Sequence, residues 1–221
     1  MLHWDGWGVA QNRERALHLL QMAAEAGHRT AQHNLGVAYD NGYELVKSHN
    51  QAFRYFSLAA RQGCRDSMYC LGSFYYLGEG VAQDYAKARY WYRKGAQLGQ
   101  VESMADLGRC YQRGVGGRRN QRHALFWFTK AVEAGSVRAT TWLGLEYTLK
   151  PTEDWAKARY WLEQAAEHQQ SHAMYLLGIW AAEGWTGDEK IADALFWFEK
   201  AVQSGHNRAG LRLAELQGEQ F

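Results

Sequence analysis

The feature that most constrains this chain is a pair of residues, Leu-Gly, that recurs at a nearly constant spacing. The glycines of the five pairs lie 36, 36, 36 and 34 residues apart, at Gly36, Gly72, Gly108, Gly144 and Gly178. An alanine before an aromatic cluster keeps the same register, at Ala16, Ala52, Ala88, Ala124, Ala158 and Ala194. Two independent markers with one period in the range of about 20 to 50 residues are typical of a repeat protein.

Each repeat predicts two antiparallel helices joined by a glycine-containing turn. The second helix is expected to begin after a side chain that can cap its first-turn amides: Asn12, Ser48, Asp84, Asn120 and Asp154. It is expected to end where glycine adopts the left-handed conformation: Gly27, Gly63, Gly99, Gly135 and Gly205. Glycine inside a helix costs roughly 1 kcal/mol relative to alanine, so the Leu-Gly pairs predict sites where two helices approach closely.

Aromatic residues on the second helix, such as Tyr90, Trp91 and Tyr92, give each helix pair apolar surface on two sides. One hairpin cannot bury both sides, whereas stacked hairpins can, so the sequence predicts an all-α linear solenoid. We expect a single repeat domain that comprises a partial repeat 1–27, repeats 28–63, 64–99, 100–135, 136–169 and 170–205, and a capping helix 206–221.

The clearest repeat has a specific residue pattern: Leu71-Gly72, Tyr75, Gly78-Glu79-Gly80-Val81, Lys87-Ala88, Trp91 and Gly95-Ala96. This pattern resembles the Sel-1-like repeat, a relative of the tetratricopeptide repeat, and the resemblance covers essentially the whole chain. It implies a right-handed superhelical α-solenoid of antiparallel helix pairs. It also implies an adaptor function in protein complexes, but it does not identify a partner, because fold does not determine function.

Composition narrows the class of partner and the compartment. The net charge is +2 with interspersed acidic and basic residues, which gives no broad electrostatic reason to expect nucleic acid or a membrane surface. No apolar stretch approaches the roughly 18 residues of a membrane span, and the N-terminus lacks the pattern of a signal peptide. Cys64, Cys70 and Cys110 are interpreted as reduced thiols. We therefore expect a cytoplasmic protein.

The sequence contains only weak candidates for metal ligands or catalytic residues. The closest histidine pairs do not place both rings on one helix face: His168 with His172, and His28 with His33. No His-Cys grouping has the spacing of a zinc site. Cys64 and Cys70 flank a turn without an evident base, so a nucleophilic thiol is a weak hypothesis. We expect no enzymatic activity and no cofactor.

An arginine cluster supports an alternative function. The turn at 114–117 follows a predicted helix and lacks the Lys-Ser/Thr ending of a phosphate loop, so we interpret it as a repeat turn. Four arginines lie beside it: Arg113, Arg118, Arg119 and Arg122. A solvated loop is the expectation, and an anion- or nucleic-acid-binding module that uses Arg113–Arg122 is the alternative.

The predicted binding surface follows from helical geometry. In the first helix of each repeat, positions equivalent to Ala31, Leu35 and Tyr39 face the core, and the opposite positions would line a concave groove. Their mixture of aromatic, aliphatic and arginine side chains is typical of a surface that binds a peptide or protein. The predicted partner-binding residues are His33, Val37, Tyr69, Ser73, Tyr76, Leu77, Arg109, Arg113, Thr141, Leu145, Tyr175 and Ile179. The competing interpretation is that curvature of the superhelix partly buries this stripe.

The N-terminal end predicts self-association. The chain begins after the first Leu-Gly position, so the helix expected at about 13–26 lacks a complete neighbour on one side. Leu2 and Trp4 could form only a short lid over it. Because an uncovered solenoid end exposes apolar surface, we expect this helix to be the least protected and two chains to pair through it.

Overall fold

The computed structural model describes residues 13–218 except 44, 151–152 and 186–190. Over these residues the chain is entirely helical, with twelve α-helices and no strand, which confirms the predicted all-α fold class. The helices follow one another in this order: α1 (Arg13–Glu25), α2 (Arg29–Asn41), α3 (His49–Arg61), α4 (Arg65–Leu77), α5 (Tyr85–Gln97), α6 (Val101–Arg113), α7 (Gln121–Glu133), α8 (Val137–Glu146), α9 (Trp155–Glu167), α10 (Ser171–Ala182), α11 (Ile191–Gln203) and α12 (Asn207–Gly218).

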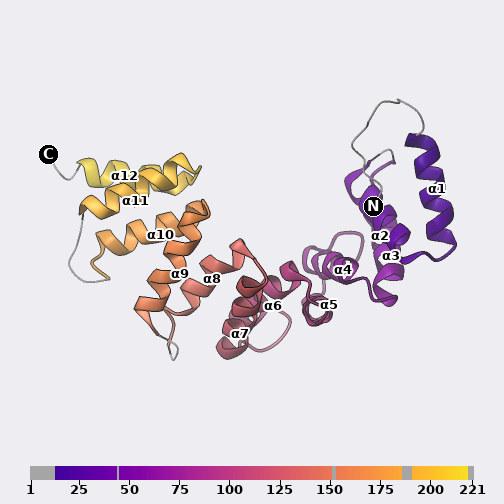
Figure 1. The fold of residues 1–221 in the computed structure, drawn as a ribbon, viewed down its shortest axis with the longest axis horizontal. Coiled ribbons are helices and arrows are strands. Elements are labelled where there is room, and N and C mark those ends of the chain that lie inside the picture. Colours follow the sequence, from indigo (N-terminus) through magenta and orange to yellow (C-terminus); the bar gives the residue numbers. More distant parts are fainter. Residues whose placement is uncertain (1–12, 44, 151–152, 186–190, 219–221) are drawn as a thin grey trace. The chain divides into compact units, whose positions relative to one another are not determined.

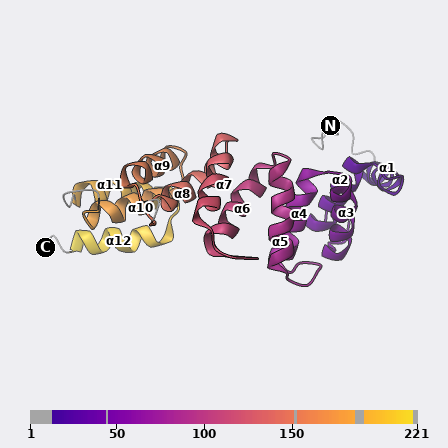
Figure 2. The same ribbon diagram turned by 90° about the horizontal axis from the view of Figure 1, so that it is seen from below.

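The chain divides into two compact units. The N-terminal unit comprises Met1–Ser103 with Val115–Gly117, and the C-terminal unit comprises Met104–Gly114 with Arg118–Phe221. In the N-terminal unit α2 packs on α3, and α4 packs on α5 (Figure 1). In the C-terminal unit α8 packs on α9, and α10 packs on α11 (Figure 2). Each of these pairs is the helical hairpin that one repeat of the sequence predicts.

Four second helices in the described part of the chain, α3, α5, α7 and α9, begin at their predicted capping residues. Asp84 Oδ1 accepts a hydrogen bond from the backbone amide of Lys87 at 3.0 Å. Ser48, Asn120 and Asp154 accept the equivalent bond from the amide three residues later. Each such cap stabilises a helix by about 1 kcal/mol, because it satisfies an amide that has no partner within the helix. The predicted cap Asn12 lies outside the described residues.

The second helices also end as the glycines predict. The five terminating glycines all have φ between +77° and +90°: Gly27, Gly63, Gly99, Gly135 and Gly205. In the remaining repeat, which ends at α9, the same left-handed position is occupied by Gln169 with φ +60°. No other non-glycine residue in the described part of the chain has a positive φ. Gln169 is therefore a site of backbone strain.

The Leu-Gly pairs lie where two helices approach closely, as predicted. The leucines are buried, and the glycines face a side chain of the second helix. A Cβ atom on Gly72 would lie 2.5 Å from ring carbons of Tyr92, and one on Gly108 would lie 2.5 Å from a ring carbon of Phe128. Gly144 faces Leu162 instead, at 3.0 Å. In the other four hairpins the glycine thus admits the aromatic ring that fills the space between the two helices.

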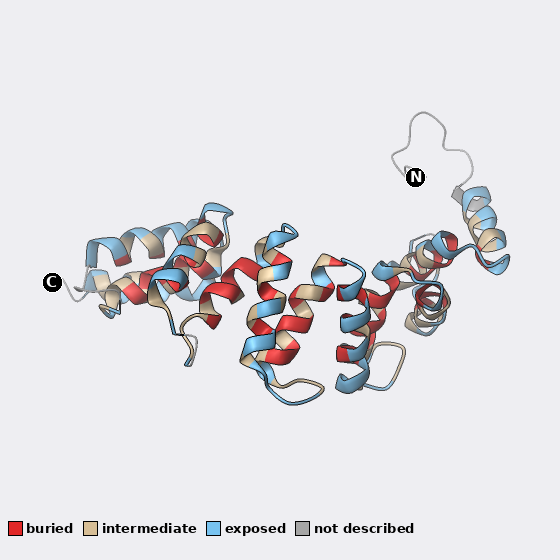
Figure 3. Cartoon of the chain, turned by 60° about the horizontal axis from the view of Figure 1, so that its bottom comes forward, coloured by how far each residue is buried: buried red, intermediate tan, exposed pale blue. Residues whose placement is uncertain are grey.

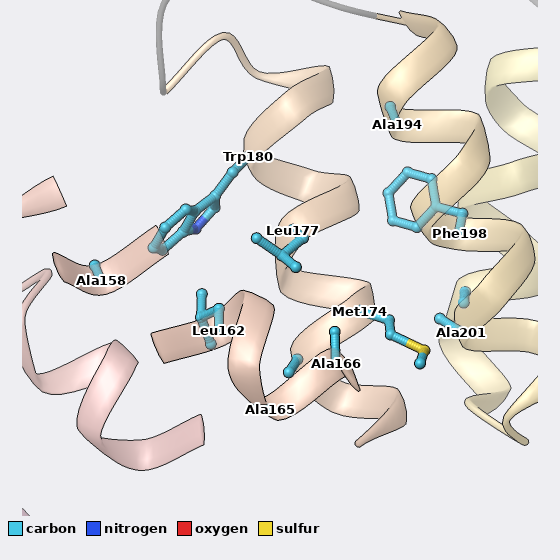
Figure 4. Packing of buried hydrophobic residues seen from close by; sticks show 12 residues of the cluster. Ala158, Leu162, Ala165, Ala166, Met174, Leu177, Trp180, Ala194, Phe198 and Ala201 are labelled. Carbon is cyan, nitrogen blue, oxygen red and sulfur yellow. The ribbon is translucent and has the colours of Figure 1, made fainter. Parts of the chain in front are cut away.

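The buried residues line the faces on which packed helices meet, and the outer faces are exposed (Figure 3). In the C-terminal unit one apolar cluster joins α9, α10 and α11 (Figure 4). Leu162 of α9, Leu177 of α10 and Phe198 of α11 are central to it. The same cluster buries Trp180, which contacts Trp155 at a ring distance of 5.4 Å. One hairpin therefore completes the core of the next, as stacking of repeats requires.

Candidate functional site

The predicted binding residues all lie on the first helices of the repeats, α2, α4, α6, α8 and α10. Leu77 and Arg113 are exposed, nine others are partly buried, and Thr141 is buried with 5% of its surface exposed. Because a partner cannot reach a buried hydroxyl, Thr141 does not belong to an open surface. The other eleven side chains present at least an edge to solvent.

In the N-terminal unit, neighbouring aromatic rings hold the predicted residues of α4 in place. The ring of Tyr69 lies 6.0 Å from that of Tyr92, and the Tyr92 hydroxyl lies 3.3 Å from Ser73 Oγ. The ring of Tyr76 packs edge-on against Tyr85 at 5.4 Å. Leu77, at the end of α4, is 58% exposed. This helix therefore offers fixed aromatic edges beside one open aliphatic side chain.

The predicted residues of α2 lie deeper in the N-terminal unit. His33 Nδ1 lies 2.9 Å from Ser67 Oγ of α4, and the imidazole ring lies 5.7 Å from the ring of Phe56. Val37 packs against the buried cluster that contains Phe74. His33 and Val37 therefore link α2 to the following repeat as well as facing solvent.

In the C-terminal unit, two guanidinium groups contact one indole ring. Arg109 Cζ of α6 is 4.7 Å from the centre of the Trp142 ring, and Arg138 Cζ of α8 is 5.1 Å from it. Asp106 binds both arginines, at 3.5 Å from Arg109 Nη1 and 3.2 Å from Arg138 Nη2. The indole also contacts the ring of Phe128 at 5.8 Å. We call Arg109, Arg138, Trp142 and Asp106 the Trp142 cluster.

Two histidines pack beside the predicted residue Tyr175 of α10. The rings of Tyr175 and His206 stack at 4.3 Å, and His172 Nδ1 lies 3.4 Å from His206 Nε2. Burial lowers the pKa of His172, and the charges of His206 and Arg208 lower it further. Burial and Arg208 likewise lower the pKa of His206. The fold therefore favours neutral imidazoles at this end of α10.

The last two predicted residues flank these clusters in the C-terminal unit. Leu145 of α8 is partly buried, and Ile179 of α10 packs against the apolar cluster of α9, α10 and α11. A partner could touch their outer edges only.

A carboxyl group is buried in α8 at a position that is apolar in the other repeats. Glu146 has 0% of its surface exposed, whereas Phe74, Cys110 and Trp180 occupy the equivalent places. Glu146 Oε2 accepts a hydrogen bond from Gln112 Nε2 at 2.8 Å. Burial raises the pKa of Glu146, and the hydrogen bond from Gln112 and the charge of a nearby arginine oppose that rise. This polar link joins α6 to α8, the two helices that carry the Trp142 cluster.

The arginines of the alternative function are all exposed: Arg113, Arg118, Arg119 and Arg122. The glycines beside them have a packing role. A Cβ atom on Gly116 would overlap the backbone carbonyl of Tyr85, and one on Gly117 would overlap the Arg89 guanidinium. Gly80 has the same relation to the carbonyl of His49 one repeat earlier. The turn is therefore a repeat turn, as the sequence predicts, and it packs on α5, the second helix of the preceding repeat.

Neither a metal site nor a membrane span occurs among the described residues. No group of three His, Cys, Asp or Glu side chains in that part of the chain could hold a metal ion. None of its helices is long and apolar enough to cross a membrane.

The N-terminal lid that the sequence predicts, Leu2 and Trp4, lies outside the described residues. On α1 the side chains of Leu19 and Met22 are more than half exposed.

The repeat pattern can be assigned to a family. The Sel1 repeat matches residues 1–28, 30–64, 65–100, 101–136, 143–169 and 171–206, which is most of the chain. The chain belongs to the Sel1 repeat family. Proteins with Sel1 repeats generally mediate protein–protein interactions, and the family is generally a non-catalytic repeat scaffold. None of the curated proteins matches the chain significantly.

Solved structures of Sel1 repeat proteins have the same fold. The protective antigen c5321 of uropathogenic Escherichia coli is 33% identical, with a TM-score of 0.82 over 94% of this chain. A Sel1 repeat protein from Oxalobacter formigenes is 26% identical, with a TM-score of 0.80 over 89% of this chain and 82% of its own. The present Sel1 repeat protein spans 45% of the c5321 chain.

Sequence reasoning missed Trp142 and selected its neighbour Thr141. The signal was present in the residue spacing. Arg138 and Trp142 are four residues apart on α8, which places them on one helix face. Asp106 and Arg109 are three apart on α6 and form an ion pair at 3.5 Å. What the spacing could not show is that these two faces of the Sel1 repeat protein meet.

Proposed function

We propose that this Sel1 repeat protein is a non-catalytic scaffold that binds a protein or peptide segment through the first helices of its repeats. The observation that carries the proposal is the Trp142 cluster, in which both Arg109 and Arg138 contact the indole. Tryptophan and arginine are the residues most enriched among those that dominate binding energy at protein interfaces. A cluster that combines them on a first helix suits the centre of such an interface.

The geometry of the cluster reduces the entropy that binding would cost. Immobilising a long side chain at an interface costs about 0.5–1.5 kcal/mol. Asp106 and the indole already restrict both guanidinium groups, while 44% of the Arg138 side chain and 30% of the Arg109 side chain remain exposed. A guanidinium retains donors for a second carboxylate in its plane. The favoured ligand is therefore a segment with an apolar or aromatic side chain for Trp142 and an acidic side chain beside it.

The N-terminal unit offers a second surface of a related kind on α4. Tyr69 and Tyr76 present ring edges that contacts with Tyr92 and Tyr85 hold in place, and Leu77 is open beside them. Rigid aromatic edges contribute contact area at low entropic cost. This surface supports binding of apolar side chains from a protein partner, independently of the Trp142 cluster.

Site-specific photo-crosslinking tests the proposal and captures whichever partner occupies the surface. A photoreactive residue replaces Arg113, which is exposed on α6 one turn beyond Arg109, and a control places it at Arg159, exposed on α9. We expect a discrete protein adduct from position 113 that is lost in the Arg109→Gln/Arg138→Gln variant and absent from position 159. Equal adducts from both positions, or an adduct insensitive to the double variant, would refute the proposal.

The same experiment separates the alternative function. If the Arg113–Arg122 cluster binds nucleic acid, the adduct should be sensitive to nuclease. Its yield should also fall steeply with salt, because phosphate contacts displace condensed counterions. A protease-sensitive, nuclease-resistant adduct with a shallow salt dependence supports the scaffold.

A further inference from the structure

An open cleft of about 400 Å³ lies in the N-terminal unit at the beginning of α4. Cys64, the N-cap residue of α4, lines it together with His33 of α2 and two exposed arginines, Arg29 and Arg65. The Cys64 side chain is partly exposed and makes no capping hydrogen bond. The cleft thus brings a nucleophilic atom, an imidazole and positive charge to one accessible place.

The surroundings of Cys64 provide the base that its sequence neighbours lack. His33, which is 31 residues earlier, lines the same cleft as Cys64, and its Nδ1 atom lies 2.9 Å from Ser67 Oγ. Burial alone would raise the pKa of Cys64. The hydrogen bonds from His33 and Ser67 and the charge of His33 outweigh burial and lower that pKa to about 7. The sequence showed no base near Cys64 and made a nucleophilic thiol a weak hypothesis, whereas the structure places His33 in the same cleft.

The other two cysteines of the chain are internal controls. Burial raises the pKa of Cys70 to about 12, and the charges of Asp40 and Asp66 raise it further. Cys110 is buried, with 3% of its surface exposed. The nucleophile in thiol chemistry is the thiolate, so a protonated or inaccessible thiol reacts slowly at neutral pH. Reactivity is expected at Cys64 alone among the three.

We propose that Cys64 is a covalent modification site at which its thiolate exchanges with a small anionic disulfide. The Cys64 thiol gives its proton to solvent, with His33 and Ser67 as hydrogen-bond partners of the resulting thiolate. The thiolate attacks one sulfur of the disulfide, whose S–S bond breaks as a new S–S bond forms to Cys64. The other half leaves as a thiolate and takes up a proton. Cys64 is thereby oxidised and the departing half is reduced, so atoms and electrons balance.

The cleft favours this class of reagent for two reasons. Exchange is fastest when the attacking thiol has a pKa close to the ambient pH, because a stronger acid gives a poorer nucleophile. Arg29 and Arg65 place two positive charges at the rim against the single negative charge of Asp66. That balance attracts a disulfide with carboxylates, such as oxidised glutathione, and disfavours a cationic one, such as cystamine.

The test follows the reaction of the full chain with oxidised glutathione by peptide mass mapping across pH. We expect modification at Cys64, with a half-maximal rate near the pKa of about 7 and a rate at least about tenfold above those of Cys70 and Cys110. Cys64→Ser should abolish it. Reaction of Cys70 or Cys110 at the same rate, or a midpoint near the ordinary thiol value of about 8.5, would overturn the proposal.

Two substitutions test the role of His33 as a positioning residue. His33→Gln should move the midpoint for Cys64 towards about 8.5, whereas His28→Gln, at an exposed histidine preceding α2, should leave it at about 7. An unchanged midpoint in His33→Gln would overturn the assignment. The native midpoint tests the proposal even if His33→Gln fails to fold, which circular dichroism would reveal.

The charge argument has its own measurement. At low ionic strength oxidised glutathione should react faster than cystamine, and Arg29→Gln/Arg65→Gln should remove the difference, as should high salt. Equal rates for the two disulfides with the native chain would overturn the preference for an anionic reagent.

Discussion

The substitution Gly108→Ala tests whether the Leu-Gly register exists to admit an aromatic ring. Gly108 lies inside α6, and the ring of buried Phe128 on α7 occupies the space that a Cβ atom would need. The two atoms would be 2.5 Å apart. Gly210 in α12 is the matched control, because its nearest neighbour would be Val202 Cγ2 at 3.9 Å.

The expected free-energy changes have opposite signs. Carbon atoms pack best at about 3.5–4.0 Å, so the Phe128 ring must move by about 1 Å in Gly108→Ala. Overpacking of this kind costs about 1–3 kcal/mol, and a fully buried ring places the cost near the upper end. Alanine recovers roughly 1 kcal/mol of helix propensity. The net result is a loss of about 2 kcal/mol for Gly108→Ala and a gain of up to about 1 kcal/mol for Gly210→Ala.

Urea and thermal denaturation followed by circular dichroism measure both changes. For a chain of this size a loss of about 2 kcal/mol lowers the melting temperature by roughly 4–8 °C. Combining Gly108→Ala with Phe128→Leu should cost less than the sum of the single changes, because leucine leaves room for the methyl group, as Leu162 does opposite Gly144. If Gly108→Ala stabilises the chain as Gly210→Ala does, the close-approach explanation is wrong.

Three further predictions follow from the described residues. Gln169→Gly should stabilise the chain by about 1 kcal/mol in urea denaturation, because glycine adopts a positive φ without strain, and a loss of stability would contradict this. Burial lowers the pKa values of His172 and His206 below the ordinary 6.5. At a pH between the folded and the unfolded values, these two groups therefore bind more protons in the unfolded chain than in the folded one. Their contribution to stability should be complete above pH 6.5 and lost as the pH falls through the folded values, and a His172→Gln/His206→Gln variant should lack this dependence. Sedimentation should show concentration-dependent pairing that Leu19→Ser/Met22→Ser abolishes, because both side chains are exposed on α1, and a monomer at all concentrations would refute the pairing.

The features that the sequence predicted well depend on local chemistry. A capping side chain acts on an amide three residues away, as Asp84 does with Lys87, and the same bond forms at Ser48, Asn120 and Asp154. A terminating glycine acts through its own φ angle. The Leu-Gly pairs required an inference about tertiary structure, namely that two helices meet at each glycine. That inference was correct. A residue that destabilises a helix recurs at the same position of each repeat, and this recurrence indicates that the position has a packing role.

The features that the sequence did not reveal join residues about one repeat apart. His33 contacts Ser67, Gln112 contacts Glu146, and His172 contacts His206, each across 34 residues. Inspection of short sequence spacings compared His172 only with His168, which it set aside, and found no base near Cys64. In stacked repeats the residue one period away is a spatial neighbour, so polar pairs at that separation are the signal to seek. Which edge of α8 faces solvent, and hence Trp142 rather than Thr141, required the structure.

The central claim is that the Trp142 cluster binds a protein partner, and the affinity of charge variants tests it most directly. Calorimetry would measure the affinity of the purified partner that is captured from position 113 for three chains. These are the native chain, the Arg109→Gln/Arg138→Gln variant and the Lys130→Gln/Arg159→Gln variant. The last removes two exposed, ion-paired cations from α7 and α9 and so matches the change in net charge. We expect the first variant to weaken binding at least tenfold, about 1.4 kcal/mol, and the second to leave the affinity within about twofold. Equal affinities for all three chains, with native helical content, would contradict the claim.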